Sequence, residues 1–383
     1  MDIKLYYGTN RNFEGGTRWA PREYGTHFSA DGSENLRFGA LTLTANTQAV
    51  AQMLSSVRTD DQACHGEELV EILTTAAEGA VIEAFEETLD RNLPEAAQPN
   101  AKLGSARFFD ELKQQMDAGK DVVIFIHGFN TSWASAVGTA AALQITLNNW
   151  KGLEPDYTKE VAVVLFSWPS DGTAVPWTSY RSDRTDAEAS GRAIGRGLLK
   201  FRDFLVALQG QVLRQEAQAC GSKVHLLCHS MGNFVLQSAL PRVADYSPGS
   251  AMPRLLDNVF LCAADVDDDV LEPGEPMARL DELCDFVSVY TNRDDRALVV
   301  SDWTKGNPDR LGAKGPAHLS LLHEKIETID CTAVVHGAVQ HSYYLDGLAN
   351  RDIYQSILDL RPTDIRRNRT EMSRANFCLR REK

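Results

Sequence analysis

The sequence lacks long apolar runs. No stretch reaches the roughly 18 consecutive apolar residues that a membrane-spanning helix needs, although 43% of the 383 residues are hydrophobic. The first residues, MDIKLYYGTNRN, contain no basic region followed by an apolar stretch, so we expect no secretory signal peptide. These absences predict a protein that works in the cytoplasm and has no transmembrane segment.

Cysteine is sparse and irregularly spaced. The seven cysteines are odd in number and include no CxxC pair, which argues against a disulfide framework or a zinc site. The HExxH and P-loop motifs are missing, and the acidic run Asp265–Asp269 lacks the later glycine and glutamate that a calcium loop requires. The sequence therefore predicts reduced thiols, no metal and no cofactor.

Positive charge is also scarce, since 39 Lys and Arg stand against 53 Asp and Glu and give a net charge of −14. Binding to nucleic acid requires clustered bases, so we expect no such partner. The imbalance is local: eleven acids and one base lie between Asp60 and Glu95, whereas eight bases and three acids lie from Arg361 onward. We interpret both segments as solvated; the alternative for the acidic one is a surface that docks a protein partner.

From residue 104 onward, apolar runs typical of buried strands alternate with segments of helical periodicity. The predicted strands are 121–126, 161–166, 224–228, 258–263, 286–290 and 326–335, and the predicted helices are 106–118, 133–150, 183–217, 231–240 and 348–360. This alternation predicts an α/β fold in which helices flank a mostly parallel central sheet. In such folds the site lies at the carboxyl ends of the strands.

The chain divides into three parts in this interpretation. Residues 1–103 form an N-terminal extension, in which short strands precede an acidic segment, about 46–93, with helical periodicity throughout. Residues 104–362 form the core, and residues 363–383 form a basic C-terminal tail. The first predicted strand, Ile3–Tyr7, is a candidate to join the sheet of the core.

The most informative motif is VHLLCHSMGN, from Val224 to Asn233. A short apolar strand leads directly into His-Ser-Met-Gly, and helical periodicity follows at once. This is the pattern of the nucleophile elbow G-x-S-x-G, with Cys228 in place of the first glycine. Because such a turn projects the serine hydroxyl above the sheet, Ser230 is the candidate nucleophile. The Met231 amide, at the start of the helix, is a candidate donor to a developing oxyanion.

A second motif, IFIHGFN, ends an earlier strand with His-Gly. Hydrolases with an elbow place their other oxyanion amide in this loop. We choose the backbone N–H of Phe129, with Asn130 as second choice, and we interpret His127 as a structural residue rather than the catalytic base.

A serine nucleophile needs a base and an acid that orients the base. The chain order for this arrangement is serine, acid, histidine. His341, in a loop before the last predicted helix, is our choice of base, with His336 as the alternative. Asp295, just after a predicted strand, is our choice of acid. Asp294 beside it and Asp265 after the preceding strand remain alternatives.

Several motifs in fixed order resemble a bacterial α/β-hydrolase family that was long catalogued as a domain of unknown function and is taken to be esterase-like. They are YYGTNRN, IHGFNTS, LFSWPS, HSMGN, AADVD, NRDDRAL and QHSYY. The resemblance covers about residues 3–8 and 104–360. It implies Ser230 as nucleophile, His341 as base and Asp295 as acid. The chain departs from the family pattern at Cys228 and Ala264 and in its pair of adjacent aspartates.

These features together predict a serine hydrolase that cleaves a small-molecule or lipid carboxylic ester through a covalent acyl-enzyme. Hydrolysis of an amide, a thioester or a lipid remains an alternative. So does a catalytically silent ligand-binding or interaction module on the same fold, because a fold alone does not fix function. Residues 299–318 are a candidate lid.

Overall fold

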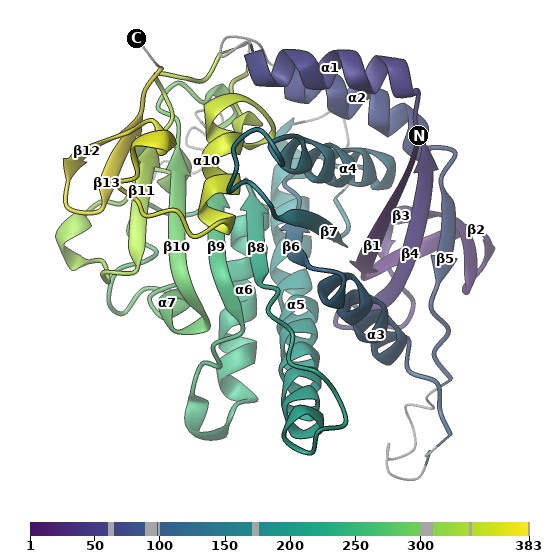
Figure 1. Ribbon diagram of the computed structural model, residues 1–383. Coiled ribbons are helices and arrows are strands. Elements are labelled where there is room, and N and C mark those ends of the chain that lie inside the picture. Colours follow the sequence, from purple (N-terminus) through teal and green to yellow (C-terminus); the bar gives the residue numbers. More distant parts are fainter. Residues whose placement is uncertain are drawn as a thin grey trace.

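The computed structural model describes residues 1–59, 65–88, 98, 100–170, 176–298, 309–336 and 339–381, without the side chains of 57–59 and 176–179. Its strands are β1 (Asp2–Thr9), β2 (Arg11–Thr17), β3 (Ala20–Phe28), β4 (Arg37–Thr44), β5 (Val81–Ala84), β6 (Lys120–Ile126), β7 (Glu160–Ser167), β8 (Val224–His229), β9 (Leu256–Cys262), β10 (Cys284–Thr291), β11 (Ile326–Asp330), β12 (Arg369–Ser373) and β13 (Asn376–Leu379). Eleven of these form one sheet in the order β12-β13-β11-β10-β9-β8-β6-β7-β1-β4-β5, while β2 and β3 pair separately (Figure 1).

The sheet is parallel from β1 through β13 and antiparallel only at its two edges, where β4, β5 and β12 pair. Central strands carry apolar residues without alternation because both of their faces are covered. In β6, Val123 and Phe125 belong to one core cluster, whereas Val122 and Ile126 belong to the other. The predicted α/β fold with a mostly parallel sheet is confirmed.

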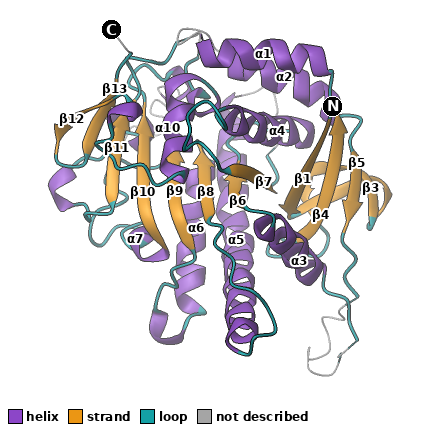
Figure 2. Cartoon of the chain, in the orientation of Figure 1, coloured by secondary structure: helices purple, strands orange, loops and turns teal. Residues whose placement is uncertain are grey.

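Helices cover both faces of this sheet (Figure 2). They are α1 (Thr47–Thr59), α2 (His65–Ala77), α3 (Gly104–Asp117), α4 (Trp133–Asn149), α5 (Pro176–Leu213), α6 (Gly232–Asp245), α7 (Leu280–Leu283), α9 (Leu311–Lys314) and α10 (Gly347–Ile357). Side chains of α1, α2, α4 and α10 contribute to one core cluster, and those of α3, α5, α6 and α7 contribute to the other. None of the helices within the described ranges is long and apolar enough to cross a membrane.

The N-terminal residues contribute directly to the large sheet. β1 pairs in parallel with β7, and β4 and β5 extend the sheet beyond β1. The expectation of continuous helical structure over 46–93 was wrong in one respect, since α2 ends at Ala77 and β5 follows at Val81–Ala84. Gly79 and the β-branched pair Val81-Ile82 disfavour the helix there, and pairing with β4 stabilises the strand instead.

The basic C-terminal segment also differs from the solvated tail that its charge predicts. It contains β12 and β13, which extend the opposite edge of the sheet. Asp352 on α10 is fully buried and forms ion pairs with Arg367 at 3.0 Å and Arg369 at 2.6 Å. The bases of this segment therefore serve partly to neutralise a buried acid, which charge counting does not reveal.

Candidate active site

Ser230 occupies the sharp turn between β8 and α6. Its φ is 52°, in the left-handed region that non-glycine residues rarely adopt. The turn is fixed from two sides: the Ser230 N–H donates to the Cys262 carbonyl at 3.0 Å, and the Asn233 side-chain amide donates to the Ser230 carbonyl at 2.9 Å. Backbone strain of this kind is typical of functional residues held by their surroundings, and the strand–turn–helix context of the elbow motif is present.

Small residues allow the strands and the helix to approach at this turn. A Cβ at Gly232 would lie 2.5 Å from the Ile126 carbonyl oxygen, and a Cβ at Gly128 would lie 2.8 Å from Ser230 Cβ. Cys228, at the position of the usual first glycine, is fully buried, and burial raises the pKa of its thiol. A small neutral side chain is therefore accommodated there.

His341 and Asp295 lie next to each other although 46 residues separate them. His341 Nδ1 and Asp295 Oδ2 are 2.7 Å apart. Asp295 is fully buried, and its other carboxylate oxygen accepts hydrogen bonds from the Ala297 and Leu298 N–H groups at 3.0 and 3.2 Å. Backbone amides thus fix the carboxylate. An imidazole that donates from Nδ1 to such a carboxylate has its Nε2 lone pair available as a base.

His229, the residue directly before Ser230, contacts His341. The His229 and His341 rings lie 4.6 Å apart between centroids, and His229 Nε2 is 3.3 Å from the His341 carbonyl oxygen. Burial and the charge of His341 lower the pKa of His229 well below its usual value. Within the described part of the chain, no hydrogen bond joins the Ser230 hydroxyl to His341. Catalytic contacts often tighten only when substrate binds.

The alternative acids have other surroundings. Asp294 is exposed, and its N–H donates to Asn292 Oδ1. Asp265 is buried, accepts the Tyr180 hydroxyl at 2.8 Å and forms an ion pair with Arg310 at 3.3 Å. Of the three carboxylates, Asp295 has the hydrogen bond to the His341 imidazole.

The alternative base, His336, lies near the chosen one. It lines a small cavity of about 20 Å³ together with His341, Ser342 and Glu67. That volume is enough for about one water molecule. His341 has the hydrogen bond to the buried Asp295, and for this reason we keep it as the candidate base.

The candidate oxyanion donors are the backbone amides of Phe129 and Met231. In the residues that the structure describes, neither N–H donates a hydrogen bond. The second choice, the Asn130 N–H, donates to Asp183 Oδ2 at 3.3 Å and is therefore occupied. Asp183 is fully buried and also accepts a hydrogen bond from Ser170. Asp183, on α5, therefore holds the loop that contains Asn130, a role that the sequence did not reveal.

His127, which we interpret as a structural residue, is enclosed by its neighbours. It is buried and stacks on Trp168 with an interplanar angle of 9°. Nδ1 donates to the Gly128 carbonyl at 2.9 Å, and Nε2 accepts the Trp168 N–H at 3.2 Å. Burial, with a contribution from the Arg11 guanidinium, lowers the pKa of His127 to about 3. The ring is therefore neutral and engaged at both nitrogens.

Arg11, which sequence reasoning did not single out, supports the same loop from the N-terminal extension. The residue is 1% exposed, and its guanidinium donates to Ser167 Oγ, Gly25 O and Thr131 O at 2.7–2.9 Å. The available signal was the polar end of YYGTNRN directly after an apolar strand. Charged residues at the carboxyl end of a sheet strand are candidates for supporting a site at that edge.

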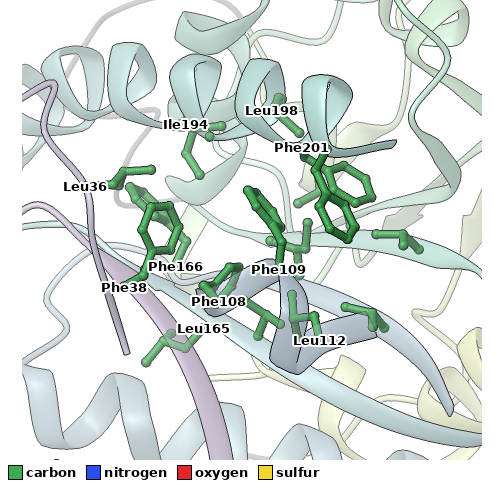
Figure 3. Close-up of a pocket in the computed structure, with 18 of the residues that line it drawn as sticks. Leu36, Phe38, Phe108, Phe109, Leu112, Leu165, Phe166, Ile194, Leu198 and Phe201 are labelled. Atoms are coloured by element: carbon green, nitrogen blue, oxygen red, sulfur yellow. The ribbon is translucent and has the colours of Figure 1, made fainter. Parts of the chain in front are cut away.

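One apolar cavity among the described residues has a lining that does not include the candidate catalytic residues. Figure 3 shows it between α3, α5 and the sheet, with Phe38, Phe108, Phe109 and Phe201 turned into it. Its volume is about 80 Å³. Specific ligand sites combine an apolar wall with a few convergent polar groups, and this lining is almost wholly apolar. We assign it no function.

The candidate lid lies partly outside the described residues, since only 309–318 of its 299–318 belong to them. This described part is packed against the end of β9. Gly312 and Ala264 are joined by a hydrogen bond of 2.9 Å, and a Cβ at Gly312 would lie 2.2 Å from the Ala264 nitrogen.

Potential metal ligands do not gather in the described part of the chain, where no group of three or more His, Cys, Asp or Glu side chains could hold a metal ion. The cysteines described there are free thiols, namely Cys220, Cys228, Cys262, Cys284, Cys331 and Cys378.

A mostly parallel sheet covered on both faces, with a serine in a strained turn after a central strand, defines an α/β hydrolase. The family model for α/β hydrolases of unknown function, DUF900, matches residues 105–361, and the chain belongs to this family. The resemblance seen in the sequence is thereby confirmed.

The likeness of this chain to one solved structure is limited. A puromycin-hydrolyzing peptidase of Mycobacterium tuberculosis matches 64% of this chain at 11% identity and a TM-score of 0.24. The match spans 35% of the peptidase, little more than a third of its length. No curated protein matches the chain.

Proposed function

We propose that this protein is a serine hydrolase that cleaves carboxylic esters of small molecules or lipids with Ser230, His341 and Asp295. The observation that carries the proposal is the 2.7 Å hydrogen bond between His341 and the buried Asp295, close to a serine with a φ of 52°. Membership of an α/β-hydrolase family supports the general reaction class.

In the first half of the reaction, His341 Nε2 takes the proton of the Ser230 hydroxyl while the oxygen attacks the acyl carbon. The negative charge that develops on the carbonyl oxygen is stabilised by the Phe129 and Met231 N–H groups. Asp295 holds the Nδ1–H of His341 and stabilises the imidazolium that forms.

The tetrahedral intermediate then collapses, and His341 returns its proton to the leaving alcohol. Ser230 is left esterified to the acyl group. A water molecule, deprotonated by His341, attacks the same carbon. As the second tetrahedral intermediate collapses, the bond from the acyl carbon to the Ser230 oxygen breaks, the acid leaves, and His341 returns its proton to the Ser230 oxygen. Every step uses side chains and amides of this chain and water.

Covalent labelling tests the proposal. The wild-type protein should react with a fluorophosphonate probe and hydrolyse short p-nitrophenyl esters, and Ser230→Ala should lose both activities. Ser238→Ala is the matched control, because this serine lies on α6 close to the elbow and donates only to the Phe234 carbonyl at 2.9 Å. It should retain labelling and turnover.

Other results would direct the assignment elsewhere. Labelling that persists in the Ser230→Ala variant would refute Ser230 as the nucleophile. Absence of labelling and turnover in the wild type, with tight binding of a small ligand, would favour a silent binding module. Faster turnover of amide, thioester or lipid substrates would keep the mechanism and change the substrate class.

We also propose that the protein works in the cytoplasm, because free thiols persist in a reducing compartment. A protein partner for the acidic part of the extension stays a prediction. It would be tested by comparing the oligomeric state and co-purifying proteins of the wild type with those of a variant whose exposed acids on α2 are changed to glutamine.

A further inference from the structure

Helix α2 of the N-terminal extension packs against the segment that follows His341. The Gly66 N–H at the start of α2 donates to Asp346 Oδ2 at 2.9 Å. A Cβ at Gly66 would lie 2.8 Å from Leu345 Cβ, so the two backbones are close. Leu69 and Leu73 of α2 are fully buried in the core cluster that contains Leu345. The helix and this segment therefore form one packed unit.

Glu67, in the first turn of α2, faces the candidate base. It lines the 20 Å³ cavity together with His341 and Ser342. Burial raises the pKa of the Glu67 carboxyl, while the charge of His341 and the nearby Ser342 hydroxyl oppose the rise. The next residue, Glu68, has an exposed side chain and pairs with His65 at 3.1 Å. The two neighbouring glutamates thus have different surroundings.

The His341 loop needs support of this kind. Gln340, directly before the base, has a φ of 59°, and its carbonyl accepts the Asn292 side-chain amide at 2.8 Å. The imidazole itself is held at Nδ1 by Asp295. On the other side of His341, Ser342 and Glu67 line the same small cavity, so the Glu67 carboxylate lies beside the Ser342 hydroxyl. Catalytic groups must be held within about 0.5 Å of the productive geometry by such supporting contacts.

We propose that Glu67 is a positioning residue for His341: from the N-terminal extension, its carboxylate accepts the Ser342 hydroxyl and thereby fixes the loop that carries the base. This inference rests on the proposed function, because it takes His341 to be the base. Glu67 lies outside residues 105–361, so the extension supplies part of the site that the family region alone lacks.

The test compares Glu67→Gln with Glu68→Gln, which makes the same chemical change one residue further along the same helix. Ser342→Ala removes the donor of the proposed hydrogen bond, and the double variant Glu67→Gln/Ser342→Ala completes a double-mutant cycle. Two quantities are measured for each protein: the rate of fluorophosphonate labelling at Ser230, and the downfield NMR signal of the His341 Nδ1 proton. The signal is assigned by its loss in Asp295→Asn.

We expect Glu67→Gln and Ser342→Ala each to slow labelling about tenfold, since a misplacement of about 1 Å can cost on the order of 100-fold. Both should displace the proton signal, the double variant should be no slower than the slower single one, and Glu68→Gln should match the wild type. Melting temperatures identify loss of folding. If Glu67→Gln does not fold, the labelling rate and proton signal of Ser342→Ala alone test the inference.

Wild-type labelling rates and an undisturbed proton signal in Glu67→Gln, or in Ser342→Ala if that variant decides, would overturn the inference while the proposed function stands. If instead the wild type is not labelled at Ser230, the proposed function fails. The proton signal then decides on Glu67 by itself: a displaced signal supports its role in holding His341, and an unchanged one refutes it.

Discussion

The buried neutral His127 makes a quantitative prediction about acid stability. Its pKa is lowered from 6.5 to about 3, first by burial and then by the Arg11 guanidinium. Between these two values the unfolded chain binds one proton that the folded chain does not bind. This contribution to stability is fully present above about pH 6.5 and is lost as the pH falls toward 3.

The magnitude follows from the same two values. Each pH unit within the window costs about 1.4 kcal/mol of unfolding free energy, so acidification from pH 6.5 to pH 5 costs about 2 kcal/mol from His127 alone. His127→Gln cannot titrate and should lose this part of the slope, even though it is less stable at neutral pH. The glutamine carbonyl oxygen of the variant can accept the hydrogen bond from the Trp168 N–H, which His127 Nε2 accepts at 3.2 Å in the wild type.

The assay is urea unfolding followed by tryptophan fluorescence at several values between about pH 7.5 and about pH 5. The informative quantity is the difference in slope between variants, because titrations common to both proteins cancel. The exposed His27 provides the control, and His27→Gln should keep the wild-type slope. Equal slopes for the wild type and His127→Gln would refute the account of a buried neutral imidazole.

Three further substitutions test other parts of the structure. Asp295→Asn should lower kcat for a p-nitrophenyl ester about 10⁴-fold, because the asparagine amide no longer holds the His341 imidazole in the tautomer that acts as a base. A loss below about tenfold would contradict the assignment of the acid. Gly232→Ala should lower the unfolding free energy in urea by about 1–3 kcal/mol, because its Cβ would lie 2.5 Å from the Ile126 carbonyl oxygen, and unchanged stability would show that the turn can relax. Asp352→Asn should cost about 3–5 kcal/mol in the same assay, because two buried guanidinium groups lose their carboxylate, and a change within about 0.5 kcal/mol would show that solvent reaches these groups.

The core elements were predictable because their signals are local. β6 appears as a continuous apolar run because both of its faces are buried, and α3 begins within two residues of its predicted start at residue 106. α5 begins at Pro176 rather than near residue 183. Proline suits the first turn of a helix, where its missing N–H costs nothing. Proline is also common in loops, so Pro176 by itself did not indicate where the helix begins.

The edges of the sheet were not predictable from local patterns. β5 is four residues long and becomes a strand by pairing with β4. β12 and β13 lie in a segment whose charge suggests solvation. That segment is held by the pairing of β13 with β11 and by ion pairs with Asp352, which lies more than ten residues away on a helix. Short edge strands depend on such partners more than on their own propensity.

The sequence by itself determined the α/β class, the order of the core strands and helices from residue 104 onward, and the sharp turn at Ser230, because periodicity and the elbow motif are properties of neighbouring residues. Only the tertiary structure decided that Asp295, rather than Asp294 or Asp265, contacts His341, and that Arg11 and Glu67 of the N-terminal extension lie beside the loops of the site. Those contacts join residues dozens to hundreds of positions apart. Their formation depends on the burial and hydrogen bonding that the packed sheet and helices impose.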